Sequence, residues 1–265
     1  MSSTSAILRA VHARSGTDLS CYRPATVERR IQNRMISLGL KDLGSYQALV
    51  ERCAEEPSRL IERITIKVSR FYRNPEVFEA IRSRVLAPQR PERPLSVWSA
   101  GCARGEEAYT LAMLLEERGL RGCVTASDID PFALAAAREG VYREDLACDL
   151  PAGLRERFLR PLQGACAGQV AVSESLKQRV AFELSDLTEE DAAPRTFDLV
   201  CCRNVLIYWS ADKQLALLRG LLAKLRPGGF LCLGEAEWPH PSLGPELEAI
   251  SPRLRLFRRI AGAQP

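Results

Sequence analysis

The segment Val97–Met113, VWSAGCARGEEAYTLAM, constrains the fold most, because an apolar run passes through a glycine-rich turn into an apolar helical pattern. In an open α/β sheet such a turn lies at the carboxyl end of a strand, where ligands bind. Gly101 and Gly105 form a G-x-x-x-G pattern, which is neither the G-x-G-x-x-G of dinucleotide sites nor a P-loop. Glu106 and Glu107 follow at once and would repel a polyphosphate. The turn therefore predicts a ligand whose nearest part is neutral or cationic.

Short apolar runs alternate with helical patterns over the rest of the chain. The runs are LSVWSAG, GCVTASDID, RVAFELSD, TFDLVCCRN, FLCLGEAE and RLRLFRRI. This alternation predicts an α/β fold, a doubly wound Rossmann-like sheet of mostly parallel strands, with the last two runs as an antiparallel edge. The alternation breaks at about 141–178, where Gly-rich turns and QVAVS predict a small inserted antiparallel β-subdomain.

Residues 1–88 show helical patterns and no convincing strand, so we expect a helical N-terminal domain there and a second domain over 89–265, divided at the charged, proline-rich QRPERP. One helix is expected to end before Pro57 and the next to start near Ser58. Another is expected from Pro75 to Pro88, with Asn74 as its N-cap. The stretch ATVERRIQNRMISLGL is expected to form an amphipathic helix. Its apolar side would carry Val27, Ile31, Ile36 and Leu38, and its basic side would carry Arg29, Arg30 and Arg34.

Composition excludes several classes of protein. The nine cysteines contain no C-x-x-C pair and there are only two histidines, so we expect free thiols and no metal site. No apolar run approaches the roughly 20 residues of a membrane helix, and the N-terminus lacks a signal-peptide pattern, which favours a cytoplasmic protein without membrane insertion. The net charge is +4, and residues 1–90 carry 16 Lys+Arg against 9 Asp+Glu, which suggests an acidic partner or a solvated basic surface.

Two further strand ends add polar groups to the same rim. Asp128 follows Gly105 by 23 residues, and a carboxylate at about that spacing accepts hydrogen bonds from ribose hydroxyls. Asn204 ends a later apolar run and offers an amide donor and acceptor. Adenosine with a cationic centre and no phosphate describes S-adenosylmethionine, which becomes S-adenosylhomocysteine after methyl transfer. Each residue taken alone would suit an ordinary loop or helix cap.

Five stretches together resemble the chemotaxis receptor glutamate methyltransferases. They are ITIKVSRFYRNPEVF, VWSAGCARGEEAYTLAM, ASDID, FDLVCCRNVLIYW and LRPGGFLCLG, and the resemblance spans about residues 25–234. It implies a small helical N-terminal domain, a cofactor-binding α/β domain and an inserted β-subdomain that would tether the receptor tail. It also implies partners, the cytoplasmic Glu-rich helices of methyl-accepting receptors.

The resemblance also implies site residues. Those falling on cofactor contacts are Lys67, Ser69, Arg73, Gly101, Glu107, Asp128, Asp186, Leu187, Asn204 and Val205, and those beside the transferring methyl group are Arg73 and Tyr208. Three departures stand out. The family usually has Asn at Lys67 and at Asp186, and Gly-His-Ser-Glu where this chain has GEAE from Gly234 to Glu237. We expect Lys67 and Asp186 to compensate one another's charge.

A glutamate acceptor is already ionised at neutral pH and needs no general base, which agrees with motifs that contain no histidine. Arg73 would orient a carboxylate, Tyr208 would donate its hydroxyl, and the arginines Arg29, Arg30 and Arg34 would dock on the acidic receptor helix. Three alternatives stay open. They are methyl transfer to another acceptor, a scaffold that binds the cofactor without turnover, and nucleic-acid binding, which the lack of aromatic residues among these arginines disfavours. We expect a monomer.

Overall fold

A seven-stranded sheet forms the centre of the computed structural model, which describes residues 3–20, 22–65, 69–87, 93–187 and 195–260. The strand order is β6-β2-β1-β7-β8-β10-β9, with the first five strands parallel and the last two antiparallel to their neighbours. The strands are β1 (Leu95–Ala100), β2 (Gly122–Asp128), β6 (Val180–Leu184), β7 (Phe197–Cys202), β8 (Leu225–Leu233), β9 (Leu247–Ser251) and β10 (Leu256–Arg259). The expected doubly wound sheet with an antiparallel edge is confirmed.

Helices cover both faces of this sheet, which explains why its strands are apolar almost throughout. Along β1 the side chains alternate, so that Val97 belongs to the apolar cluster of one face and Trp98 to the cluster of the other. Leu111 packs on the first face and Leu217 on the second. The helices around the sheet are α5 (Pro75–Ala80), α6 (Glu106–Glu117), α7 (Pro131–Glu139) and α10 (Ala211–Lys224).

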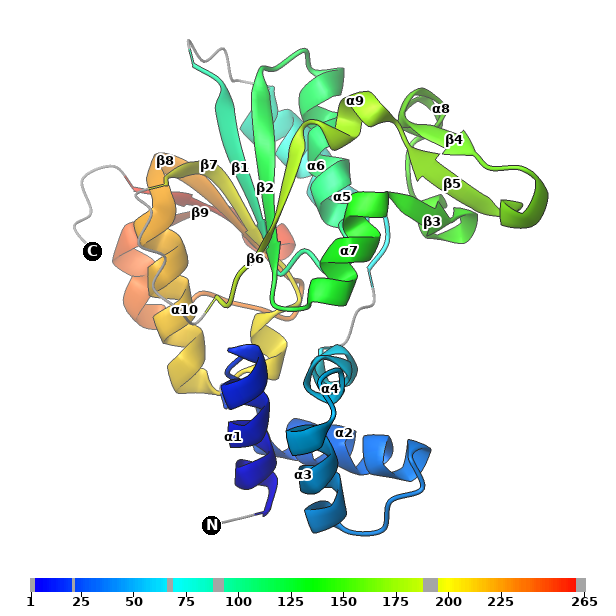
Figure 1. Ribbon diagram of the computed structural model, residues 1–265. Helices are drawn as coiled ribbons and strands as arrows, with labels where there is room; N and C mark the ends of the chain where they lie inside the picture. The colour runs from blue at the N-terminus through cyan, green and yellow to red at the C-terminus, as the bar shows by residue number, and fades with distance from the viewer. Residues whose placement is uncertain (1–2, 21, 66–68, 88–92, 188–194, 261–265) are drawn as a thin grey trace.

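The N-terminal helices lie together below the carboxyl ends of the parallel strands (Figure 1). They are α1 (Ser3–Ser15), α2 (Pro24–Ser37), α3 (Leu43–Arg52) and α4 (Glu56–Ile64). Their apolar side chains continue the cluster of the α10 face of the sheet. We call α1–α4 the helical domain. Its position leaves the rim of the sheet between two bodies of protein.

Two details of the helical domain differ from the sequence expectations. Ile36 is 75% exposed, because Val27, Ile31 and Met35 follow the helical period of 3.6 and form the buried stripe of α2 instead. The expected helix does end before Pro57, at Arg52, but the next helix begins at Glu56, two residues before the expected Ser58. Pro57 lies in the first turn of α4, where a missing N–H costs nothing.

The segment after the helical domain packs with the sheet. Phe71, Phe78 and Val85 are buried in the cluster that contains Val97 of β1. The helix expected from Pro75 is α5 followed by a π-helical turn, η1 (Ile81–Leu86). Residues 71–86 therefore belong to the sheet by packing, whereas the charged connector suggested a division near residue 88.

The expected inserted β-subdomain is present as a three-stranded antiparallel sheet that projects to one side of the molecule (Figure 1). Its order is β3-β5-β4, with β3 (Val141–Arg143), β4 (Leu159–Pro161), β5 (Gln169–Val172) and the helices α8 (Ala152–Phe158) and α9 (Glu174–Lys177). Tyr142 packs edge-on against Phe71, 4.9 Å between ring centroids. The subdomain therefore shares its core with the main sheet. Among the described helices, none is long and apolar enough to cross a membrane.

Candidate functional site at the rim of the sheet

The turn after β1 is built for close approach. Gly101 has φ +77°, and a Cβ there would collide with the Val205 side chain. The Gly101 amide donates to the Ser127 carbonyl at 2.8 Å, which joins the ends of β1 and β2. Ala103 also has a positive φ, +49°, which a side-chain-bearing residue rarely adopts. The turn therefore holds a conformation that other contacts must fix.

Asp128 supplies that contact. Its Oδ2 accepts the Ala103 amide at 2.8 Å, and its Oδ1 accepts the Asp130 amide at 3.0 Å. The residue is 9% exposed. One carboxylate therefore fixes the loops after two neighbouring strands and remains at the edge of a cavity.

Two adjoining cavities open beside these loops. The smaller, about 80 Å³, is lined by Tyr22, Thr65, Gly101, Ala103, Asp128, Ile129, Ser185, Asp186, Leu187, Asn204, Val205, Tyr208 and Trp209. The larger, about 280 Å³, is lined by Ser69, Arg70, Arg73, Gly101, Cys102, Ala103, Glu107, Arg203, Asn204, Ile207 and Tyr208. They share Gly101, Ala103, Asn204 and Tyr208. We call the two together the rim cavity.

The structure thus brings together nearly all of the residues expected to touch the cofactor. Those lining the rim cavity are Ser69, Arg73, Gly101, Glu107, Asp128, Asp186, Leu187, Asn204, Val205 and Tyr208. Lys67 lies outside the described residues, and so does its expected pairing with Asp186. Asp186 also contacts the helical domain, where its Oδ2 accepts the Asp18 amide at 3.4 Å.

The helical domain forms one wall of the rim cavity. Tyr22 and Trp209 make an isolated antiparallel bridge, and the rings of Tyr22 and Tyr208 stack with centroids 6.4 Å apart. The Arg23 amide donates to the Tyr208 carbonyl at 2.8 Å. Trp209 was expected to be a wall of the pocket or part of the core, and it lines the cavity. No local pattern indicates Tyr22, because its contacts with Tyr208 and Trp209 join segments almost 190 residues apart.

Glu107 projects into the larger cavity with both carboxylate oxygens held. Its Oε1 accepts the Ser99 hydroxyl at 2.8 Å, and its Oε2 accepts Arg203 Nη1 at 3.2 Å. The Arg203 side chain is only 3% exposed and that of Glu107 14%. Sequence reasoning missed Arg203, although a charged residue that ends the apolar run LVCC directly before Asn204 was a usable signal.

Asn204 is held by a carboxylate that sequence reasoning also missed. Asn204 has φ +62°, and its amide donates to Glu237 Oε2 at 2.9 Å. The Gly234 amide donates to the same oxygen at 2.5 Å. Glu237 is 3% exposed, and burial raises its pKa. The GEAE stretch, which departs from the expected pattern, therefore keeps an acid that shapes the Asn204 loop.

Tyr208 lines both parts of the rim cavity. Burial raises the pKa of its hydroxyl, and the positive charges of Arg73 and Arg30 act against that rise. Tyr208 is therefore a neutral hydrogen-bond donor at neutral pH. Arg30 of the helical domain is therefore close enough to Tyr208 for its positive charge to act on the Tyr208 hydroxyl.

The three arginines of α2 do not form one exposed face. Arg34 makes a two-pronged ion pair with Glu56, with Nε–Oε1 2.8 Å and Nη2–Oε2 2.7 Å, and its side chain is 10% exposed. The expectation of an exposed Arg34 is wrong, because α4 brings a buried carboxylate against it. Arg29 is exposed, and Arg30 is half-buried.

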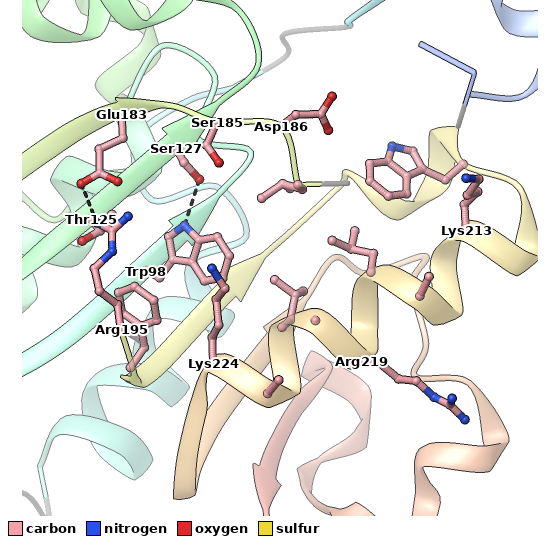
Figure 2. Close-up of a pocket in the computed structure, with 18 residues that line it drawn as sticks. Trp98, Thr125, Ser127, Glu183, Ser185, Asp186, Arg195, Lys213, Arg219 and Lys224 are labelled. Atoms are coloured by element: carbon pink, nitrogen blue, oxygen red, sulfur yellow. Dashed lines mark hydrogen bonds and ion pairs between the residues drawn. The ribbon is translucent and has the colours of Figure 1, made fainter. Parts of the chain in front are cut away.

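A larger hollow of about 650 Å³ lies beside the rim cavity, between α10 and the strands β2 and β6 (Figure 2). Its floor includes Trp98, whose indole N–H donates to Ser127 Oγ at 2.9 Å, and Arg195 pairs with Glu183 on one side at 2.7 Å. Size alone would favour this hollow as the ligand site. The rim cavity is the better candidate because the Gly turn, Asp128 and Asn204 meet there. Within the described ranges, no group of three or more His, Cys, Asp or Glu side chains is arranged to hold a metal ion.

Comparison with known proteins agrees with this geometry. Residues 3–65 match the family model "CheR methyltransferase, all-alpha domain", and residues 67–241 match "CheR methyltransferase, SAM binding domain". The chain is 36% identical to a chemotaxis protein methyltransferase of Klebsiella aerogenes, over 87% of this chain and 81% of that protein. It is 34% identical to the one from Escherichia coli, over 87% and 82%.

A third relative is much longer. The chain is 34% identical to an uncharacterized 104.1 kDa protein of Rhodobacter capsulatus, over 92% of this chain and only 26% of that protein. The two domain matches cover most of the sequence and divide at residue 66, between Ile64, which packs with the helical domain, and Phe71, which packs with the other face of the sheet. This chain belongs to the CheR methyltransferase family, with the all-alpha domain and the S-adenosylmethionine-binding domain both present.

Proposed function

We propose that this chain transfers a methyl group from S-adenosylmethionine to glutamate side chains in the cytoplasmic helical region of methyl-accepting chemotaxis receptors, forming methyl esters. It acts in the cytoplasm as a monomer. The names of its relatives support the pathway. The observation that carries the acceptor chemistry is the meeting of Arg73, Tyr208 and the charge of Arg30 at the rim cavity.

The rim cavity fits this cofactor. Ile129, Leu187 and Val205 offer apolar walls for an adenine ring, and Asp128 offers a carboxylate for the ribose hydroxyls. Glu107 offers carboxylate oxygens to a donor group of the cofactor in the larger part, and its charge is balanced by Arg203. When bound, S-adenosylmethionine supplies a methyl carbon attached to a positively charged sulfur.

The chain's own groups then have to orient an anion. A guanidinium binds both oxygens of a carboxylate, so Arg73 would direct the acceptor at the rim, and the Tyr208 hydroxyl would donate to it. An ionised carboxylate needs no proton removed before it attacks. No histidine lines the rim cavity among the residues that the structure describes. Holding the two reacting atoms in line supplies most of the acceleration.

Docking of the receptor would use α2. Arg29 is exposed and Arg30 is half-buried at the side of α2 that faces Tyr208, so an acidic helix laid across them would reach the rim cavity. Arg34 is engaged with Glu56 and takes no part in this proposal.

The product identifies the reaction. The protein is incubated with methyl-labelled S-adenosylmethionine and receptor-containing membranes, and the labelled band is then treated with base. A methyl ester releases labelled methanol, whereas a base-stable label indicates another acceptor. Cofactor binding without any labelled receptor would indicate a scaffold instead.

The docking role has its own test. Reversing Arg29→Glu with Arg30→Glu should raise the KM for receptor about tenfold or more, because both charges face the acidic helix. Affinity for S-adenosylhomocysteine should stay unchanged. The control, Lys41→Glu with Arg52→Glu, reverses two exposed charges elsewhere in the helical domain. An equal KM in both double variants would remove α2 from the docking surface.

A further inference from the structure

Arg203, directly after β7, is a buried cation that links two parts of the rim cavity. Its Nη1 donates to Glu107 Oε2 at 3.2 Å. Its Nη2 donates to the Arg73 carbonyl at 3.0 Å and to Asn74 Oδ1 at 2.8 Å. Its guanidinium carbon lies 5.3 Å from the centre of the Phe78 ring. One planar group therefore contacts a cofactor-side carboxylate and the turn that carries Arg73.

That turn is conformationally costly. Tyr72 and Asn74 have φ +55° and +62°, a region that favours glycine. Asn74 was expected to cap α5 with its side chain, but it makes no capping hydrogen bond there, because its oxygen accepts from Arg203. Within the described residues, five non-glycine residues have positive φ, and the four other than Arg255 lie at or beside the rim cavity.

Each strained position is held by a polar group from a distant segment. Thr110 Oγ1 accepts the Tyr72 amide at 3.1 Å, and Asp128 and Glu237 hold Ala103 and Asn204 as described above. Asn74 is held by Arg203, which donates to its side-chain oxygen. Arg203 also donates to Glu107, a carboxylate that lines the rim cavity.

We propose that Arg203 is a positioning residue that couples the cofactor side of the site, through Glu107, to the acceptor side, through the Arg73–Asn74 turn. The planar guanidinium allows both contacts at once, because Nη1 reaches Glu107 while Nη2 reaches the turn. A lysine has a single donor nitrogen and would have to choose between the two. The acceptor half rests on the proposed function of Arg73. The Glu107 half depends only on cofactor binding.

The experiment separates the two halves with two conservative variants. Arg203→Lys keeps the charge beside Glu107 but loses the fork. Asn74→Gly places a residue that readily adopts a positive φ at this position and removes one of the two acceptors of Nη2, leaving the Arg73 carbonyl. Arg226→Met is the control, because Arg226 forms an ion pair with Asp198 at 2.8 Å away from the rim cavity. Affinity for S-adenosylhomocysteine is measured by calorimetry, and kcat and KM for receptor methylation by label transfer.

The proposal expects both rim variants to lower kcat about tenfold while their affinity for S-adenosylhomocysteine stays within about threefold of the starting protein. Arg203→Met also removes the hydrogen bond and the positive charge beside Glu107, so it should lower that affinity about tenfold or more. The control should change none of these constants.

Other outcomes overturn the proposal. If Arg203→Lys and Asn74→Gly change only the melting temperature, Arg203 is merely structural. If they lower affinity and kcat together, the two halves are not separable as stated. Should Arg203→Met fail to fold, the two conservative variants still decide. If no variant and not even the starting protein labels receptor, the proposed function fails, while the calorimetry still tests the link to Glu107.

Discussion

The molecule contains two buried arginine–carboxylate pairs, one inside the helical domain and one at the rim cavity, and their contacts differ. In the helical domain Arg34 and Glu56 meet fork to fork, and the Tyr46 hydroxyl also donates to Glu56 Oε1 at 2.9 Å. At the rim, Arg203 gives Glu107 one hydrogen bond from Nη1, and its Nη2 donates to the Arg73 carbonyl and to Asn74 Oδ1 in the neighbouring turn. We call Arg34–Glu56 the closed pair, because its ion-pair contacts stay within the helical domain, and we expect it to affect stability. Arg203 divides its contacts between Glu107 and the Arg73–Asn74 turn and lines a cavity, so we expect it to affect the site.

The largest effect should come from breaking the closed pair. Glu56→Ala leaves the buried Arg34 without its carboxylate, and we expect the free energy of unfolding to fall by about 3 kcal/mol. Urea denaturation measures this loss, and hydrogen exchange should place it in α2 and α4. The affinity for S-adenosylhomocysteine at a temperature where the variant is folded should not move.

The matched control for this variant is Glu55→Ala, which breaks the exposed pair between Glu55 and Arg59 at the start of the same helix. We expect it to cost under about 1 kcal/mol. Equal losses in the two variants would show that the closed pair is no stronger than a surface one.

The rim should respond in the opposite way. Asp128→Ala removes the acceptor of two loop amides and a carboxylate at the cavity, so affinity for S-adenosylhomocysteine should fall about a hundredfold. Calorimetry measures the affinity. Asp145→Ala, which breaks the exposed pair with Arg143 in the inserted subdomain, is the control. A binding constant within threefold of the starting protein in Asp128→Ala would place the cofactor elsewhere.

A smaller effect is expected from acid, which should lower the free energy of unfolding by protonating Glu56 of the closed pair. Burial acts to raise the pKa of Glu56, but hydrogen bonds from Arg34 and Tyr46 outweigh it and hold that pKa below its usual 4.5. The unfolded chain then binds more protons, so this stabilisation is complete above pH 4.5 and is lost as the pH falls through the folded pKa.

The slope for one proton is at most about 1.4 kcal/mol per pH unit. Urea titrations between pH 3 and 6 measure it. The Glu56→Gln variant should show a flatter dependence of unfolding free energy on pH, and an unchanged slope would mean that Glu56 does not contribute to acid sensitivity.

The sequence predicts those features of the site that depend on neighbours in the chain or on the edge of the sheet. Gly101, Asp128 and Asn204 each follow an apolar run, and carboxyl ends of parallel strands meet at one rim, so their proximity follows from strand order alone. The alternation of runs likewise predicts the sheet and the inserted subdomain.

The missed residues depend on contacts across long stretches of sequence. Arg203 and Glu107 are 96 positions apart and Asn204 and Glu237 are 33 apart, and no local pattern links either pair. Arg34 was misjudged for the same reason, since an arginine on a polar helix side is exposed unless another helix brings it a carboxylate. The periodicity of α2 alone does not reveal α4.

The attachment of the inserted subdomain has a consequence for any partner held there. Tyr142 of β3 donates its hydroxyl to the carbonyl of Arg104 in the Gly turn at 2.6 Å, and its ring packs against Phe71 in the common core. A ligand of this subdomain would therefore sit at a fixed distance from the cofactor turn. The local concentration of a tethered acceptor would then be set by the length and stiffness of the partner's own linker, not by motion within this protein.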